Sequence, residues 1–91
     1  MGKETVLLKT EEKMSRNELV EFLHAVAEKI EEGKIILQQG GKEVKLKIPA
    51  RLELEVKAEK EVGKRKTKKK LELEIEWQVG AKGKDEPLRL G

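Results

Sequence analysis

The sequence predicts an α+β fold in which one amphipathic helix packs on one face of an antiparallel β-meander of four strands. Two observations predict it: one stretch, residues 15–33, has apolar residues at helical spacing, and later stretches have them at every second position. Short turns join the later stretches, which favours an antiparallel meander. We expect residues 1–79 to form a single domain and residues 80–91, which show no apolar pattern, to be a flexible tail.

The helix is expected over residues 15–33. Ser15 followed by Glu18 is a capping box, and Met14 and Leu19 have the spacing of a hydrophobic staple. Gly33 is expected to end the helix in a left-handed conformation. The apolar stripe that should cover the sheet consists of Leu19, Phe22, Leu23, Val26, Ala27 and Ile30.

The first hairpin is expected to pair residues 34–39 with residues 42–48 through Gly40 and Gly41. A two-residue turn of this kind needs positive φ, so we expect positive φ at both glycines. The inward residues of this hairpin should be Ile35, Leu37, Val44, Leu46 and Ile48. Residues 3–9 are a short strand candidate, which we expect to join an edge of the sheet beside the last strand.

The second hairpin is expected to pair residues 51–57, extending to Ala58, with the strand KLELEIEWQV at residues 70–79. Pro49 separates the two hairpins because proline cannot donate to a strand ladder. Residues 60–69 are expected to form a polar loop around Gly63. The last strand has one apolar face and one acidic face, and its apolar residues are Leu71, Leu73, Ile75, Trp77 and Val79.

Composition removes several classes of function. The chain has no Cys and one His, so disulfides, thiolate chemistry and the usual metal sites are not expected. It has no Gly-rich phosphate loop and no plausible Ser/His/Asp set, and we expect neither an enzyme nor a cofactor. No apolar run is long enough to span a membrane, and no secretory signal is recognised, which predicts a cytoplasmic protein.

The order of these segments resembles a known family. MSRNE opens the helix, EGKIILQQGGKEVKLKIP forms the first hairpin, and RLELEVKAE and LELEIEW form the second. Over residues 4–79 this order is similar to the amphi-Trp domain family of small prokaryotic proteins, named for an amphipathic C-terminal strand that ends in Trp. The resemblance makes Trp77 the family-signature aromatic. It implies no activity, cofactor or catalytic residue.

Four carboxylates are expected on the outer face of the second hairpin. A turn near Gly63 places Glu55 opposite Glu74 and Glu53 opposite Glu76, and like charges in those positions destabilise a sheet. They could bind a hard cation or a basic partner. The alternative, which we favour, is a solvated charged face neutralised by nearby basic residues.

The basic charge is concentrated in residues 60–70, which hold seven of the 21 basic residues and one of the 18 acidic residues. Such a cluster could contact phosphates without sequence preference. The only aromatics, Phe22 and Trp77, are both expected inside, so a stacking platform for single strands is missing. A solvated loop is the alternative. The candidate contacts are Lys64, Arg65, Lys66, Lys68, Lys69 and Lys70.

Trp77 and His24 are the remaining candidate residues. Trp77 could be a binding platform, although we favour a plug at one end of the core. His24 lies one residue past the apolar stripe and is expected to be a partly exposed helical residue. We therefore expect a non-catalytic interaction module with a protein partner or with itself as the partner. The alternative is weak, sequence-independent nucleic-acid binding through residues 60–70.

Overall fold

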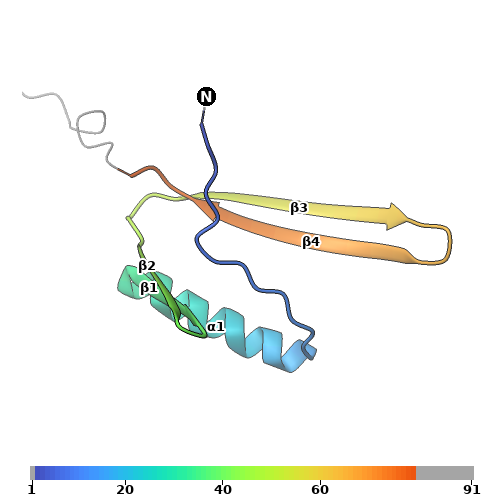
Figure 1. Cartoon of the computed structure of the whole chain (residues 1–91), viewed down its shortest axis with the longest axis horizontal. Coiled ribbons are helices and arrows are strands. Elements are labelled where there is room, and N and C mark those ends of the chain that lie inside the picture. Colours follow the sequence, from blue (N-terminus) through green and yellow to red (C-terminus); the bar gives the residue numbers. More distant parts are fainter. Residues whose placement is uncertain (1, 80–91) are drawn as a thin grey trace, which may run out of the picture. The chain divides into compact units, whose positions relative to one another are not determined.

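The computed structural model describes residues 2–79 and confirms the α+β class. The element order is α1 (Arg16–Glu32), β1 (Lys34–Gln39), β2 (Lys42–Lys47), β3 (Glu53–Val62) and β4 (Thr67–Glu76) (Figure 1). Each strand pairs antiparallel with its neighbour in sequence, which gives two two-stranded sheets, β1–β2 and β3–β4. The chain divides into two compact units, Met1–Ala50 and Arg51–Gly91, which are described separately below.

Helix α1 begins and ends where the capping signals predict. The Ser15 hydroxyl accepts a hydrogen bond from the Glu18 backbone N–H at 3.1 Å, and the Glu18 carboxylate accepts one from the Ser15 N–H at 2.9 Å. Gly33 follows the last turn with φ of 86°, and its N–H donates to the carbonyls of Lys29 and Ile30. Both helix ends therefore have partners for backbone groups that the helix itself leaves unpaired.

The first hairpin has the register that the apolar pattern predicts. Leu37 pairs with Val44 and Ile35 with Leu46, and these four side chains are half-buried, whereas Ile36 on the other face is exposed. The turn differs from the prediction, because Gly40 has φ of 59° while Gly41 is not in the positive-φ region. Positive φ at the first central residue alone is the pattern of a type II′ turn, which also suits the twist of paired strands.

In the first unit, a backbone hydrogen bond links the first hairpin to helix α1. The N–H of Ile48, just after β2, donates to the carbonyl of Gly33 at 2.8 Å, which ties the end of the hairpin to the end of α1. Helix α1 packs on β1, and Val26 and Ile30 are its half-buried apolar residues. Phe22 was expected inside, and this is wrong, since its side chain is 53% exposed. Phe22 lies one turn before Val26, towards the start of α1.

Two further expectations concern residues 3–9 and residues 80–91. The strand expected over residues 3–9 is absent, and only Leu8 in it is half-buried. The three consecutive apolar residues 6–8 lack the alternation that gives a strand one inward face, which accounts for the miss. The tail expected at residues 80–91 lies outside the described residues.

The second unit is a long hairpin whose strands extend further than expected. Strand β3 continues to Val62 and β4 begins at Thr67, so the loop predicted at residues 60–69 is reduced to four residues. The N–H of Gly63 donates to the carbonyl of Lys66 at 2.8 Å and closes this turn. The polar register pairs Glu59 with Lys70 and Glu61 with Lys68, and opposite charges across a ladder stabilise it. This cross-strand pairing explains why a segment without apolar alternation is still strand.

Candidate interaction surfaces of the second hairpin

The β3–β4 hairpin presents two chemically different faces, because alternate residues of a strand point to opposite sides. Even-numbered residues of β3 share a face with odd-numbered residues of β4, as the pairing of Val56 with Leu73 requires. This apolar face consists of Leu54, Val56, Ala58, Leu71, Leu73 and Ile75. The opposite face, called the charged face below, carries Glu53, Glu55, Lys57, Glu59, Glu61, Lys68, Lys70, Glu72, Glu74 and Glu76.

The apolar face has no cover within its own unit, which contains β3 and β4 as its only described helix or strand elements. Leu54 is 62% exposed and Leu71 is 68% exposed. No described residue of the chain is fully buried. A sheet face of this kind is normally packed against another element, so an uncovered apolar face is a candidate interaction surface.

The four candidate carboxylates lie where the sequence places them. Glu53 pairs with Glu76 and Glu55 pairs with Glu74, all on the charged face. The pKa of Glu74 is raised above its ordinary value, first by a side-chain hydrogen bond with Glu55, then by the negative charges of Glu55 and Glu76. The hairpin therefore concentrates like charge at its open end, and that charge disfavours the ionised form of Glu74.

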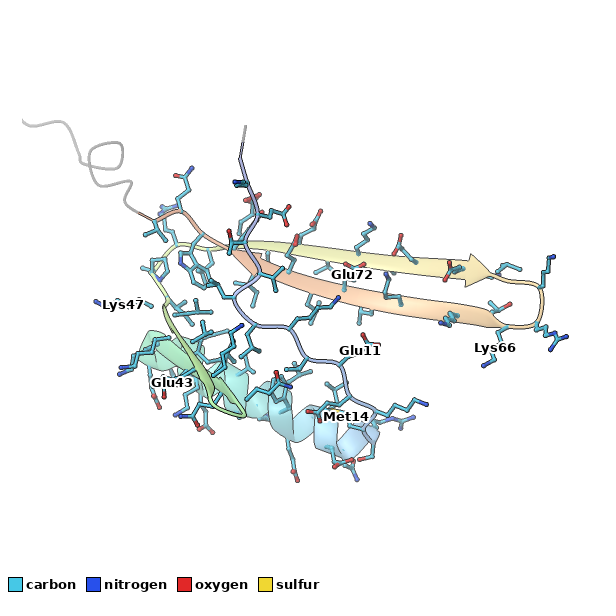
Figure 2. All side chains as sticks on the ribbon, in the orientation of Figure 1. Glu11, Met14, Glu43, Lys47, Lys66 and Glu72 are labelled. Atoms are coloured by element: carbon cyan, nitrogen blue, oxygen red, sulfur yellow. The ribbon has the colours of Figure 1, made fainter. Side chains whose placement is uncertain are left out.

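The basic segment, residues 60–70, is divided by the structure into two parts. In the strands, Lys70 lies 3.5 Å from Glu59 and 3.4 Å from Glu72, and these carboxylates raise its pKa. In the turn, Lys64, Arg65 and Lys66 have no carboxylate within 4 Å among the described residues, and Figure 2 shows Lys66 at the closed end of the hairpin. Together with Lys68 they line a shallow concavity around Gly63.

The hairpin separates its charges along its length. Acidic residues dominate the open end, where the chain enters β3 and leaves β4, and basic residues dominate the turn end. Lys69 lies on the apolar side opposite Lys60, so it belongs to a different surface from Lys68 and Lys70. The six candidate basic residues therefore do not form one patch.

Trp77 and His24 are placed more simply. Trp77 follows the last residue of β4 and is half-buried. Its burial is therefore intermediate between that of the core plug that we favoured and that of an exposed binding platform. His24 is exposed on α1, as predicted. A second shallow concavity is formed in the first unit by Thr10, Glu12, Lys13, Met14, Leu19 and Phe22.

The described residues contain no arrangement for metal binding. Within residues 2–79, no three His, Asp or Glu side chains are grouped so that they could hold an ion, and the acidic residues of the charged face are included in that finding. No helix in the same range is long and apolar enough to cross a membrane.

Sequence reasoning missed how far the charged face continues beyond the four acidic candidates. Lys57, Glu59, Glu61 and Glu72 extend it. Glu59 forms ion pairs with Lys57 on the same strand and with Lys70 across the hairpin. The signal was available in the sequence. Counting outward from the pairing of Glu55 with Glu74 gives opposite charges at all three charged-face pairs nearer the turn: Lys57 with Glu72, Glu59 with Lys70, and Glu61 with Lys68.

Comparison with known proteins gives one result about identity. Comparisons with curated proteins and with solved structures find no match. The Amphi-Trp domain model matches residues 1–91, the whole length of the sequence. With its capped helix, its two hairpins and Trp77 at the end of an amphipathic last strand, the chain belongs to the Amphi-Trp domain family.

Proposed function

We propose that this protein is a non-catalytic interaction module whose binding surface is the β3–β4 hairpin. The observation that carries the proposal is the apolar face, which no other described helix or strand of its unit covers. The charged face supports it, because separated acidic and basic regions favour a partner of complementary charge and steer its approach. The proposal requires no catalytic group and no cofactor.

A pair of double substitutions tests this proposal. Val56→Gln with Leu73→Gln makes one facing pair of the apolar face polar, and the register places Lys57 and Glu72 next along the hairpin on the other face. Lys57→Gln with Glu72→Gln is therefore a matched control in the same ladder. Partners are cross-linked to the purified chain in cell extract, and their recovery is measured. We expect the apolar double substitution to reduce this recovery by about tenfold or more, and the control to leave it unchanged. Equal recovery by all three proteins would contradict the proposal.

A second candidate function is weak, sequence-independent binding of nucleic acid by the turn of the hairpin. The observation that favours it is the group of Lys64, Arg65 and Lys66, three cations in a four-residue turn with no carboxylate partner among residues 2–79. Contacts to phosphate release counterions, so affinity for duplex should fall about 40-fold between 50 and 200 mM salt if three phosphates are neutralised.

The nucleic-acid candidate is tested by reversing charge in the turn. Lys64→Glu, Lys66→Glu and Lys68→Glu together should abolish duplex binding measured by fluorescence anisotropy. A control with the same change of net charge is Lys34→Glu, Lys45→Glu and Lys47→Glu in β1 and β2. Binding that survives reversal in the turn, or that is lost equally in the control, would remove this candidate.

A further inference from the structure

One strand of the long hairpin carries a charge pattern that is complementary to itself. On the charged face, β4 carries Lys68, Lys70, Glu72, Glu74 and Glu76. Lys66 in the turn continues the same every-second-position spacing, which gives three lysines followed by three glutamates. Leu71 lies at the midpoint. Each lysine is therefore as far before Leu71 as one glutamate is after it.

The second edge of β4 is free to pair. Among the described residues, β4 pairs with β3 on one side, and no other strand is paired with it. An edge strand has a row of backbone donors and acceptors that favours addition of another strand. The edge is ten residues long and contains no proline. A two-stranded hairpin is also marginally stable alone, and further strands would stabilise it.

Antiparallel pairing of β4 with β4 of a second copy, about a two-fold axis at Leu71, places every lysine of the pattern opposite a glutamate. Lys70 then faces Glu72 of the other copy, Lys68 faces Glu74, and Lys66 faces Glu76. Residues directly opposite each other in such a ladder lie on the same face, and opposite charges in these positions stabilise the sheet. Each contact occurs twice, because a two-fold interface is isologous.

The other edge of the hairpin does not have this property. The charged-face residues of β3 are Glu53, Glu55, Lys57, Glu59 and Glu61, with Lys57 at the midpoint. Self-pairing about Lys57 would place Lys57 opposite Lys57 and glutamate opposite glutamate at the other positions, so every pair would be of like charge, which is unfavourable. The pattern thus selects one of the two edges of the hairpin.

Pairing through β4 would also relieve repulsion within each copy. Glu74 and Glu76 already face Glu55 and Glu53 across the hairpin, and the charges of Glu55 and Glu76 raise the pKa of Glu74. Lys68 and Lys66 of the second copy would bring positive charge to these carboxylates from the opposite side. The paired sheet would have the strand order β3–β4–β4–β3, with the two apolar faces on the same side of the sheet and meeting at Leu71.

We propose that the chain forms a homodimer by antiparallel pairing of the free β4 edges, with Leu71 at the two-fold axis and the Lys66–Lys70 half of each strand facing the Glu72–Glu76 half of its partner. This inference rests on the proposed interaction function and names its partner as a second copy of the chain.

Complementary charge reversal tests the pairing. Variant one carries Lys66→Glu, Lys68→Glu and Lys70→Glu, and variant two carries Glu72→Lys, Glu74→Lys and Glu76→Lys. Each places like charges across the interface, so each should be monomeric by sedimentation velocity where the unaltered chain is dimeric. An equimolar mixture should form a heterodimer, because every pair is again opposite in charge. Lys60→Glu, Lys64→Glu and Arg65→Glu together are the control and should leave the dimer intact.

A cysteine cross-link tests the register independently. The chain has no cysteine, so Leu71→Cys introduces a single thiol. At the two-fold axis, the two Cα atoms would lie about 4.5–5.5 Å apart, within the range of a disulfide. Leu73→Cys is the control, because the two copies of that position would be separated by four residues of strand, roughly 14 Å. Mild oxidation should give a covalent dimer for Leu71→Cys and not for Leu73→Cys.

The outcomes separate this inference from the function on which it rests. A chain that stays monomeric across the micromolar range, a dimer unaffected by either charge-reversed variant, or cross-linking through Leu73→Cys in preference to Leu71→Cys would overturn β4 pairing. The interaction function would survive those results if the Val56/Leu73 pair still governed partner recovery. Circular dichroism of each variant, compared with the unaltered chain, identifies any that fails to fold, and the cross-link then decides.

Discussion

At the scale of single residues, the two glycines of the first turn are not equivalent. Gly40 has φ of 59°, a conformation that residues with a Cβ rarely adopt, while Gly41 has no positive φ. A Cβ added at either position would meet no atom within 4 Å. Backbone conformation, and not space, therefore decides the cost of substitution at both positions.

Gly40→Ala should lower the free energy of unfolding by about 1–2 kcal/mol, because alanine must adopt a left-handed conformation there. Gly41→Ala should be neutral or slightly stabilising, since it restricts the unfolded chain without strain. Urea denaturation of both variants measures the difference. Equal destabilisation by the two substitutions would contradict the type II′ turn.

Ser15 is the second residue with a role that one substitution can isolate. Its hydroxyl and the Glu18 carboxylate satisfy two backbone N–H groups at the start of α1. Ser15→Ala should cost about 1 kcal/mol, while Ser15→Asp should retain most of the stability because aspartate also caps helices. Thermal denaturation followed at the helical circular-dichroism band measures both. An Ser15→Asp variant as unstable as Ser15→Ala would contradict the capping role.

At the scale of elements, the open end of the second hairpin places glutamates opposite each other, and their charges repel. Glu55 and Glu74 face each other, and their interaction raises the pKa of Glu74. Glu74→Gln should therefore stabilise the hairpin at neutral pH, because it removes like-charge repulsion across the ladder. Amide hydrogen exchange in β3 and β4 measures the effect. Glu72→Gln is the control, and it should not stabilise, because Glu72 faces Lys57 and forms an ion pair with Lys70.

The elements differ in how far the sequence predicts them. The limits of α1 follow from Ser15, Glu18 and Gly33, because capping is a local interaction whose partners are within a few residues. The pairing of Glu55 with Glu74 follows because apolar alternation fixes register. The extension of β3 to Val62 was missed, because it depends on pairing between opposite charges and not on the apolar alternation from which the strands were predicted.

The surfaces were predictable only in part. The four acidic candidates lie together on the charged face, as the sequence predicts. The six basic candidates are divided: some lie in the turn, some lie on the charged face, and Lys69 lies opposite Lys60 on the apolar side. Phe22 was assigned to a core by its helical spacing. Spacing indicates which face of a helix is apolar, but it contains no information on how far a packing partner extends along that face.

At the scale of the whole molecule, the two units should respond in opposite directions to acid. The pKa of Glu18 is lowered, chiefly by its hydrogen bond with the Ser15 backbone. The stability that Glu18 contributes to α1 is therefore present above the pKa of Glu18 in the unfolded chain, and it is lost as pH falls through the pKa of Glu18 in the folded chain. The pKa of Glu74 is raised, so the hairpin gains stability as pH falls through the folded value and loses it as pH rises.

Mild acidification should therefore increase protection of amides in β3 and β4 before it decreases protection at the start of α1. Hydrogen exchange followed by NMR at a series of pH values measures both regions in one sample, after correction for the intrinsic pH dependence of exchange. In Glu74→Gln the gain in the hairpin should disappear while the loss in α1 remains. Parallel loss in both regions of the unaltered chain would contradict the assignment.

Every strand pairs with its nearest neighbour in sequence, and this has a consequence for synthesis on the ribosome. Contacts between neighbouring segments close short loops and form quickly. Helix α1 and the β1–β2 hairpin are complete once Ile48 has emerged from the exit tunnel, so the first unit can fold while β4 is still being translated. Strand β3 would then be exposed without its partner until Glu76 emerges, and its alternating glutamates would hinder association with neighbouring nascent chains during that interval.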